Sequence, residues 1–432
     1  MTQTTPPRAT VPLKILIVGA GVAGPATAFW LSRLGHDCTI VERYPGLRVT
    51  GLQIDVHDAG AEAADRMGVL DEIRRRRVEE EGTKFVDAED RVQAIFGRND
   101  GKKQTLTSEY EIMRGDLCKL LYERTEEKVK YRFGVTVDDF RNGTDGVTVT
   151  LSDGTVERYD LLIGADGQGS RVRRIMLHQN AEASYRRLNA FCCYFTMPRQ
   201  PEDKDNMATI CHVPGQRFIM TRWHTQARGQ TYLFTMSHTE ELREALKKDL
   251  EAERQAFTCA FADAGWKVPR LLQDMQTAED FYGQELVQVV CPNWSLGRVV
   301  LVGDAGYAPS PFTGMGTSLA FIGAYVLAGE IASHPGNLPA AFAAYDKTLR
   351  PMVDKTQKLP PGFPGAAFQE TGLKVGVLHW TVWLLSGMFQ LALVLRLPEA
   401  FSAIGKWFPG KEWTLPVYDE LEAVRPKNPY PI

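Results

Sequence analysis

The stretch Lys14-Ile15-Leu16-Ile17-Val18-Gly19-Ala20-Gly21-Val22-Ala23-Gly24 decides the fold of this chain. Its apolar first half predicts a buried strand, and the glycines that follow form the G-x-G-x-x-G pattern of a dinucleotide-binding turn. Gly19 permits the tight turn, Gly21 lets the backbone approach a pyrophosphate, and Gly24 lets the helix pack closely on the strand. The helix that begins near Ala23 would direct its free N–H groups and the positive end of its dipole at the phosphates.

The segment after this turn completes a βαβ unit. Pro25–Leu34 is expected to be a helix that stops at Gly35, and Asp37–Val41 to be a second strand. Glu42 follows, twenty-three residues after Gly19, where an acidic side chain accepts hydrogen bonds from a ribose hydroxyl. A carboxylate there favours an adenosine ribose without a 2′-phosphate, because it would repel the phosphate.

A second glycine-rich segment lies near the other end of the chain. The buried-strand pattern Val299–Val302 ends in Gly303-Asp304, and Gly314-Met315-Gly316-Thr317 opens a small-residue helix. Because a carboxylate beside a phosphate is repulsive, Asp304 is expected to bind a sugar or ribityl hydroxyl, while the helix N-terminus stabilises negative charge elsewhere on the cofactor. Two such segments predict one large dinucleotide, held by a domain that the chain leaves and re-enters.

The composition is that of an ordinary soluble globular protein. The chain has 432 residues, 44% of them apolar and 24% charged, and its net charge of −3 gives no reason to expect a nucleic-acid partner. The seven cysteines are scattered without a C-x-x-C pair, and the eight histidines show no ligand cluster, so neither a metal site nor a redox disulfide is predicted. Free thiols indicate a reducing compartment, and we expect a cytoplasmic protein.

One segment leaves membrane association open. Val375–Leu395 holds twenty-one residues without a formal charge, flanked by Lys374 and Arg396. That length could span a bilayer or dock on its surface. Four polar residues interrupt the segment, namely His379, Thr381, Ser386 and Gln390. A buried or surface-docked helix of a cytoplasmic protein therefore fits equally well.

The pattern along the chain predicts an α/β fold with an α+β substrate lobe. We expect a Rossmann-like cofactor domain built from discontinuous segments, a β-sheet substrate domain and a C-terminal apolar helical segment. The cofactor domain is expected to take residues 12–75, 105–180 and 291–358, the substrate lobe residues 76–104 and 181–290, and the helical segment residues 366–415. Ala59–Arg77 and Glu111–Arg124 are expected to be helical.

Three motifs, in this order, resemble those of a known family. They are the N-terminal G-x-G-x-x-G, Asp166-Gly167 within GADGQGSRVR, and Gly303-Asp304. From about Leu13 to Arg350 the chain resembles the class A flavoprotein monooxygenases, which share the para-hydroxybenzoate hydroxylase fold, and among them the tetracycline-inactivating and salicylate-hydroxylase-like members. The resemblance implies an FAD-binding domain, with NAD(P)H as co-substrate. Since no second complete G-x-G-x-x-G follows a strand, NAD(P)H would have no domain of its own.

The resemblance also assigns roles to single residues. Glu42 would bind the adenosine ribose, Arg114 would contact FAD, and Asp304 would hold the ribityl or pyrophosphate region. Arg48 falls at a position linked to NAD(P)H, with a solvated loop arginine as the alternative, and Asp166 belongs to a motif that serves both FAD and NAD(P)H. The full set implied for the cofactor is Gly19, Gly21, Gly24, Glu42, Arg43, Asp55, Arg114, Asp166, Asp304, Gly314, Gly316 and Thr317.

The family's mechanism makes physical sense for such a site. NAD(P)H would reduce the flavin, oxygen would add at C4a to give a hydroperoxide, and its distal oxygen would attack an electron-rich ring or alkene. The protein would position the substrate and exclude water. No acid or base declares itself, so the catalytic residues stay unassigned. Pro311, Phe312 and Gly314 resemble the loop at the flavin's reactive face, while Arg217, Trp223 and His224 are substrate candidates that could equally be core or surface residues.

We therefore predict an FAD-dependent monooxygenase that hydroxylates or epoxidises an aromatic or polyketide-like small molecule, in specialised metabolism. Two alternatives remain. One is an FAD-dependent reductase or dehydrogenase on the same fold, and the other is a non-enzymatic protein of this fold that binds a lipidated partner. The presence of Glu42, Arg114 and Asp304 together argues against the second.

Overall fold

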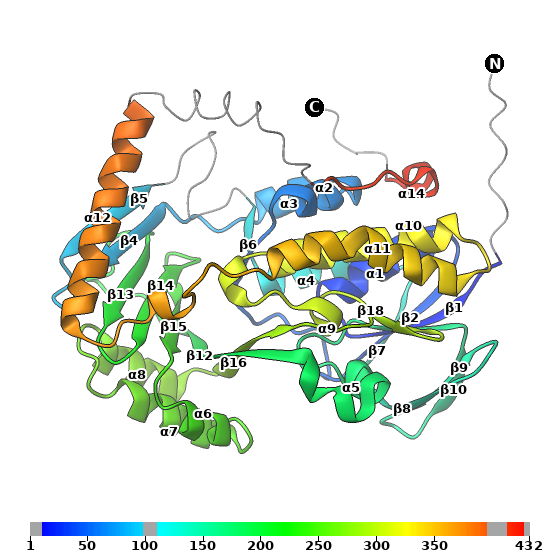
Figure 1. The fold of residues 1–432 in the computed structure, drawn as a ribbon, viewed down its shortest axis with the longest axis horizontal. Coiled ribbons are helices and arrows are strands. Elements are labelled where there is room, and N and C mark those ends of the chain that lie inside the picture. Colours follow the sequence, from blue (N-terminus) through cyan, green and yellow to red (C-terminus); the bar gives the residue numbers. More distant parts are fainter. Residues whose placement is uncertain (1–10, 98–109, 395–412, 427–432) are drawn as a thin grey trace.

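The structure, a computed structural model, describes residues 11–97, 110–394 and 413–426. Two large sheets lie side by side, and helices pack on both (Figure 1). The predicted α/β class is confirmed. Parts of the predicted ranges, namely residues 98–104, 105–109 and 395–412, lie outside the described residues, and the division into domains stays a prediction.

A six-stranded sheet forms the cofactor side of the molecule. Its order is β17 (Ser295–Leu296), β18 (Val299–Leu301), β11 (Leu161–Gly164), β1 (Lys14–Val18), β2 (Asp37–Glu42) and β7 (Lys130–Phe133), all parallel except β17. Residues Ile15, Leu16 and Ile17 of β1 are fully buried, as the unbroken apolar run of a central parallel strand requires. The three strands that carry the glycine motifs are therefore neighbours, although they are far apart in sequence.

Helices cover this sheet on both sides. α1 (Ala23–Arg33) joins β1 to β2 as predicted and packs on α10 (Gly316–Ser333), which α2 and α11 also contact (Figure 1). Among the described residues, α10 is the one helix long and apolar enough to cross a bilayer, and most of it is buried inside the protein. The other helices on this side are α2 (Asp58–Arg66), α3 (Leu70–Arg75), α4 (Arg114–Glu123), α5 (Arg171–Leu177), α9 (Asp304–Tyr307), α11 (Leu338–Thr356) and α14 (Asp419–Val424).

The second large sheet has seven strands. Their order is β16 (Tyr282–Val289), β12 (Tyr185–Pro198), β15 (Arg228–Thr235), β14 (Arg217–Trp223), β13 (Ala208–Val213), β4 (Gly82–Val86) and β5 (Val92–Gly97). Side chains such as Ile219 and Leu233 pack beneath three helices on one face, α6 (Thr239–Ala245), α7 (Leu250–Phe261) and α8 (Val268–Thr277). The alternate side chains form the opposite face, where they meet Leu52 and Phe312 from the cofactor side.

Smaller elements complete the fold. They are the ribbon β3 (Gln53–Asp55) and β6 (Glu111–Met113), the three-stranded sheet β8 (Val137–Asn142), β9 (Val147–Leu151) and β10 (Val156–Tyr159), and the short turns η1 (His178–Asn180), η2 (Glu182–Ser184), η3 (Pro311–Thr313) and η4 (Gly365–Ala367). Two predicted helices are shorter than expected. Gly68, with a φ of 75°, separates α2 from α3, and Glu111–Met113 pairs with β3, so that α4 begins only at Arg114.

Helix α12 (Gly372–Val394) contains almost all of the uncharged segment, and Leu395 lies outside the described residues. It runs along β5, where Ser386 Oγ donates a hydrogen bond of 2.9 Å to the carbonyl oxygen of Ile95 (Figure 1). His379 and Ser386 are buried against the sheet, whereas Trp380 is exposed. One side of the helix packs against the protein and carries polar groups. The described part of α12 therefore fits a helix docked on the protein's own surface, and not a bilayer span.

Candidate active site

The glycine motifs meet at the carboxyl edge of the six-stranded sheet. A Cβ on Gly19 would lie 2.5 Å from the carbonyl oxygen of Ala165, and a Cβ on Gly303 would lie 3.0 Å from the Cβ of Ala23. A Cβ on Gly24 would come within 1.9 Å of the carbonyl oxygen of Gly19. Larger residues would therefore separate the strand ends from α1. Edges of this type are where open α/β sheets bind nucleotides.

Glu42 ends β2 beside the first glycine turn. Its carboxylate oxygens accept hydrogen bonds from the backbone N–H of Ala20 (2.9 Å) and of Tyr44 (3.0 Å). These bonds fix the carboxylate at the turn and leave lone pairs for a ribose hydroxyl. Arg43 is exposed, and its guanidinium lies 5.1 Å from the ring centroid of Tyr44.

Arg114, Gly21 and Asp304 form one cluster. The Nη2 atom of Arg114 would lie 3.3 Å from a Cβ on Gly21, and its side-chain carbons would contact a Cβ on Gly51. Loss of hydration raises the pKa of Asp304, and the guanidinium of Arg114 acts in the opposite direction. Asp304 follows Gly303, whose φ of 64° lies in the region that favours glycine. Both predicted cofactor charges thus lie above the glycine turn.

The loop before α10 also ends at this cluster. Its φ angles are 85° at Ser310 and 65° at Gly314, with the turn Pro311–Thr313 between them. Positive φ at a serine is strained backbone, which concentrates at functional sites. A Cβ on Gly316 would lie 3.7 Å from Oδ1 of Asp304. The start of α10 therefore lies beside the second glycine motif, as predicted for a cofactor-binding helix N-terminus.

The segment after β3 approaches the same loop. A Cβ on Gly314 would lie 3.8 Å from Nε2 of His57, which is itself 3.8 Å from Oδ2 of Asp55. The backbone N–H of His57 donates a hydrogen bond of 2.9 Å to Oγ of Ser318 in α10. Thr317 lies in the first turn of that helix, where backbone N–H groups have no partner within the helix. The structure thus brings the predicted flavin contacts Asp55 and Thr317 to one place.

Asp166 has a structural task in the middle motif. Its oxygens accept hydrogen bonds from Oγ of Ser170 (2.5 Å) and from the backbone N–H of Arg171 (2.6 Å) and Val172 (3.2 Å). Burial raises the pKa of Asp166, and these hydrogen bonds oppose that rise. The carboxylate caps the start of α5. Its predicted role toward FAD and NAD(P)H stays a prediction.

Arg173 is a residue that the sequence reasoning missed. It is fully buried and donates hydrogen bonds to the carbonyl oxygens of Gln168 (2.6 Å) and Ala305 (2.7 Å). These bonds join the Asp-Gly turn of the middle motif to the helix that begins at Asp304. The only sequence signal was its place in the GADGQGSRVR segment.

Two of the substrate candidates lie on the helix-covered face of the seven-stranded sheet. Arg217 forms an ion pair of 2.6 Å with Asp263, which follows α7, and donates a hydrogen bond of 2.7 Å to the carbonyl oxygen of Ala260 in that helix. Trp223 is buried in the core on the same side of the sheet. Side chains alternate along β14, so these residues point away from the face that meets the cofactor side. Their positions fit the alternative interpretation of Arg217 and Trp223, as residues of the protein core. His224 follows β14 and is half-buried, and loss of hydration lowers its pKa.

Aromatic side chains form the face that meets the loop before α10. The ring centroid of Phe312 lies 6.2 Å from that of Phe234 and 6.2 Å from that of Phe368. Phe218 stacks on Phe234 at 4.4 Å, and Tyr232 lies 6.3 Å from Phe234. The alternation within β14 and β15 predicts that such residues share a face. Which face the loop would meet was not readable from the sequence.

The protein-family model described as the FAD binding domain matches residues 12–356 of this sequence. This chain belongs to the class A flavoprotein monooxygenases. It is 37% identical to the FAD-dependent monooxygenase asL4 of Sarocladium schorii over 434 residues, which cover 95% of this chain and 99% of that protein. It is 39% identical to the flavin-dependent monooxygenase eupH of Phoma sp. over 366 residues, which cover 79% and 84% of the two chains. The crystal structure of tetracycline destructase Tet(51) superposes with a TM-score of 0.72 at 30% identity, covering 88% of this chain and 98% of that one.

The predictions of FAD as the cofactor and of monooxygenase activity are thereby confirmed at the level of the family, and the use of NAD(P)H stays a prediction. The chain is an FAD-dependent monooxygenase, and relatives with these names share nearly its whole length. The glycine turn agrees with this assignment, because the absence of a side chain at Gly19 and Gly24 lets β1 and the start of α1 pack closely. Which residues of the monooxygenase contact FAD or NAD(P)H stays a prediction.

Arg48 of the monooxygenase lies where its two sides meet. Its guanidinium lies 5.3 Å from the ring centroid of Tyr44, which follows β2, and 5.0 Å from that of Tyr282, the first residue of β16. Aromatic faces attract a cation at such distances. Arg48 is therefore held between the two sheets and is half-buried.

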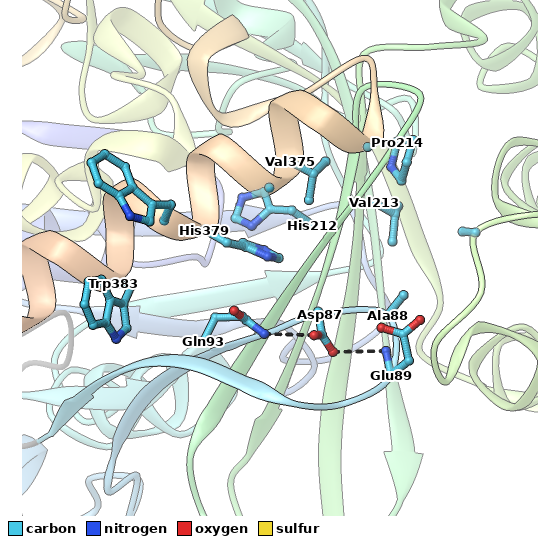
Figure 2. Close-up of a pocket in the computed structure, with 14 residues that line it drawn as sticks. Asp87, Ala88, Glu89, Gln93, His212, Val213, Pro214, Val375, His379 and Trp383 are labelled. Atoms are coloured by element: carbon cyan, nitrogen blue, oxygen red, sulfur yellow. Dashed lines mark hydrogen bonds between the residues drawn. The ribbon is translucent and has the colours of Figure 1, made fainter.

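The monooxygenase also has a cavity of about 890 Å³ at the outer end of its seven-stranded sheet. Figure 2 shows His212 and His379 together in it, with α12 on one side and the β4–β5 turn on the other. Their ring centroids are 5.9 Å apart, and burial lowers the pKa of His212 to about 4. Phe218 lies 5.5 Å from His212 and 5.1 Å from Phe368. These rings separate the cavity from the loop before α10.

Proposed function

We propose that this enzyme uses NAD(P)H and O2 to hydroxylate or epoxidise an aromatic or polyketide-like small molecule, in specialised metabolism. The observation that carries the proposal is the aromatic face of the seven-stranded sheet, where Phe218, Tyr232 and Phe234 lie next to Phe312 at the carboxyl edge. Such a surface binds flat apolar rings by burial and ring stacking. Bound FAD, once reduced, supplies the activation of oxygen.

The residues for FAD follow from the cluster at the strand ends. We assign the pyrophosphate to the N-terminus of α1, which packs closely on β1 at Gly19 and Gly24, and the adenosine ribose to the carboxylate of Glu42. Arg114 contributes positive charge above Gly21. The remaining contacts are assigned to Arg43, Asp55, Asp166, Asp304, Gly314, Gly316 and Thr317.

The chain's own contribution to the reaction is to position the substrate and keep water out. Phe312, in the loop before α10, contacts both Phe234 and Phe368, and these apolar rings exclude water from the reacting centre. Pro311 and Gly314 shape that loop. Because water promotes the loss of hydrogen peroxide, its exclusion directs more of the reducing equivalents to oxidation of the substrate.

NAD(P)H is assigned to the side of the enzyme marked by Arg48. The guanidinium lies between Tyr44 and Tyr282, where it can pair with a phosphate of the co-substrate. The flat rings beside it offer stacking surfaces to the nicotinamide. The seven cysteines are all free, which supports the cytoplasm as the compartment that supplies NAD(P)H.

One experiment tests the proposal as a whole. The protein is purified with its flavin, and oxygen uptake is measured with NADH or NADPH against a panel of phenolic and polyketide compounds under ¹⁸O₂. We expect at least one compound to stimulate uptake and to gain a single labelled oxygen atom. Substrate turnover without incorporated label would instead show a reductase or dehydrogenase, and a colourless protein would favour the non-enzymatic alternative.

A further inference from the structure

Gln53 stands out among the buried glutamines. It is 6% exposed, and neither Nε2 nor Oε1 of its side chain has a hydrogen-bond partner among the described residues. Three other buried glutamines do have partners there. Gln230 bonds Gly51 and Tyr232, Gln288 bonds Arg186, Pro309 and Gln357, and Gln357 bonds Val289 and Ala308. Buried amides are almost always paired, so a partner from outside the described chain is indicated for Gln53.

The direction of the Gln53 side chain follows from the ribbon β3–β6. Ile54 and Ile112, which pair directly, pack into the core of the cofactor side. Side chains alternate along a strand, so the residues next to Ile54 face the opposite way. On that opposite face Glu111 accepts a hydrogen bond from Arg222 of β14. Gln53 therefore faces the seven-stranded sheet, at the end of its aromatic face.

The polar groups around Gln53 are occupied by one another. Its backbone N–H donates to Oη of Tyr232 (3.4 Å), Tyr232 Oη donates to Oε1 of Gln230 (2.7 Å), and Gln230 Nε2 donates to the carbonyl oxygen of Gly51 (2.8 Å). Arg222 is bonded to Glu80 and Glu111. The network holds the backbone of Gln53 in place without using its side chain. The strand that carries the amide is therefore fixed, and both polar atoms of the amide stay available to a ligand.

We propose that Gln53 anchors the substrate of this enzyme through a polar group on its aromatic ring. This inference rests on the proposed function and names the substrate class further. An amide donates from Nε2 and accepts at Oε1, so its complement is a hydroxyl and a carbonyl on adjacent ring positions. The aromatic face around Phe234 holds the ring, and Gln53 selects its polar edge. A buried amide rejects an analogue that leaves it unpaired.

The test compares Gln53→Leu with Gln230→Leu. Leucine at position 53 removes two unpaired polar atoms, so the variant should unfold at the same temperature as the wild type or a higher one. Leucine at position 230 breaks two hydrogen bonds and should lower the unfolding temperature. Flavin content should be unchanged in Gln53→Leu. A lower unfolding temperature for Gln53→Leu would show that the amide is already paired within the protein, and would overturn the inference.

Substrate selection is measured by the change in flavin absorbance on binding of 2-hydroxyacetophenone and of its methyl ether. The wild type should prefer the hydroxyl compound by roughly tenfold or more, and Gln53→Leu should bind the two within about twofold. Equal binding of the two compounds by the wild type would overturn the proposed role of Gln53. So would a preference for the hydroxyl compound that Gln53→Leu keeps, or release of the flavin from this variant. The proposed function fails separately, if no panel compound gains oxygen in the wild type.

Discussion

At the scale of single residues, the carboxyl edge of the six-stranded sheet depends on glycines, because a Cβ there would clash with backbone. A Cβ on Gly24 would lie 1.9 Å from the carbonyl oxygen of Gly19, which is backbone and cannot move aside. Gly24→Ala should therefore push α1 from the strand end, weaken flavin binding at least tenfold and destabilise the fold by about 1–3 kcal/mol. Flavin fluorescence and thermal unfolding measure these effects. Gly46→Ala is the control, because nothing lies within 4 Å of a Cβ there, and normal flavin binding by Gly24→Ala would contradict the assignment.

Arg114 tests the charge above the glycine turn. Arg114→Ala removes the guanidinium next to Gly21 and should lower flavin affinity by roughly tenfold or more, since hydrogen bonds to charged groups contribute about 1.5–3 kcal/mol. Titration of the flavin-free protein with FAD measures the change. Arg124→Ala, at the exposed end of the same helix, should bind FAD like the wild type. Equal affinities of the two variants would remove Arg114 from the site.

Substitution of Asp166 distinguishes a helix-capping role of its carboxylate from a role in binding NAD(P)H. Asp166→Ala deletes the acceptor for Ser170, Arg171 and Val172 at the start of α5 and should lower stability by about 1–2 kcal/mol. Denaturant unfolding measures this loss. Steady-state kinetics gives the second readout. Unchanged stability together with a raised KM for NAD(P)H would show that the carboxylate serves the co-substrate instead.

At the scale of elements, regular periodicity was predictable and long-range pairing was not. The βαβ unit followed from apolar runs and glycines, and the structure has it as β1, α1 and β2. The predicted helix over Glu111–Arg124 lost its first residues to β6, because β3 offered a pairing partner for Glu111–Met113. The predicted helix over Ala59–Arg77 divides at Gly68, whose positive φ ends α2. Local sequence carries no signal for the first change and only a weak one for the second.

The contact between β13 and α12 predicts an acid-sensitive step. Burial lowers the pKa of His212 from 6.5 to about 4, so in that range the unfolded chain binds a proton that the folded chain does not. Stability should therefore fall as the pH drops from 6.5 to 4, by at most about 3 kcal/mol from this residue. His212→Phe should reduce the fall in denaturant unfolding curves. His178→Gln, an exposed site, should leave it unchanged, and an unaltered pH profile in His212→Phe would refute the assignment.

At the scale of the whole molecule, the proposed reaction site lies where the two sheets meet. Phe234 stacks on Phe218 at 4.4 Å and contacts the loop before α10 through Phe312. Phe234→Ala should admit water there and raise the hydrogen peroxide released per NAD(P)H consumed several-fold. Phe257→Ala truncates a ring of the helix-covered face, which should cost about 3–5 kcal/mol of stability without added peroxide. Equal peroxide release from both variants would show that the aromatic face does not shield the reaction.

The substrate side shows where prediction from sequence ended. Arg217 and Trp223 carry suitable chemistry and lie on the right strand, yet they point toward α7 and α8. Gln53 lies in the stretch Gly51–His57, in which the resemblance assigns a role only to Asp55, and only its unpaired side chain inside the fold distinguishes it from the other buried glutamines. Whether each of these residues can reach a substrate depends on which face of its strand is covered by other parts of the protein.

The sequence by itself determined the cofactor and the family. Glycine spacing, the acid at Glu42 and the late Gly303-Asp304 are local requirements of a backbone that must approach phosphates and riboses, so they are legible residue by residue. Only the tertiary structure decided which side chains lie on the face that we propose for the substrate. In the seven-stranded sheet, one face of each strand packs against helices and the other face meets the cofactor side. Which side chains lie on which face depends on packing between residues that are far apart in the chain.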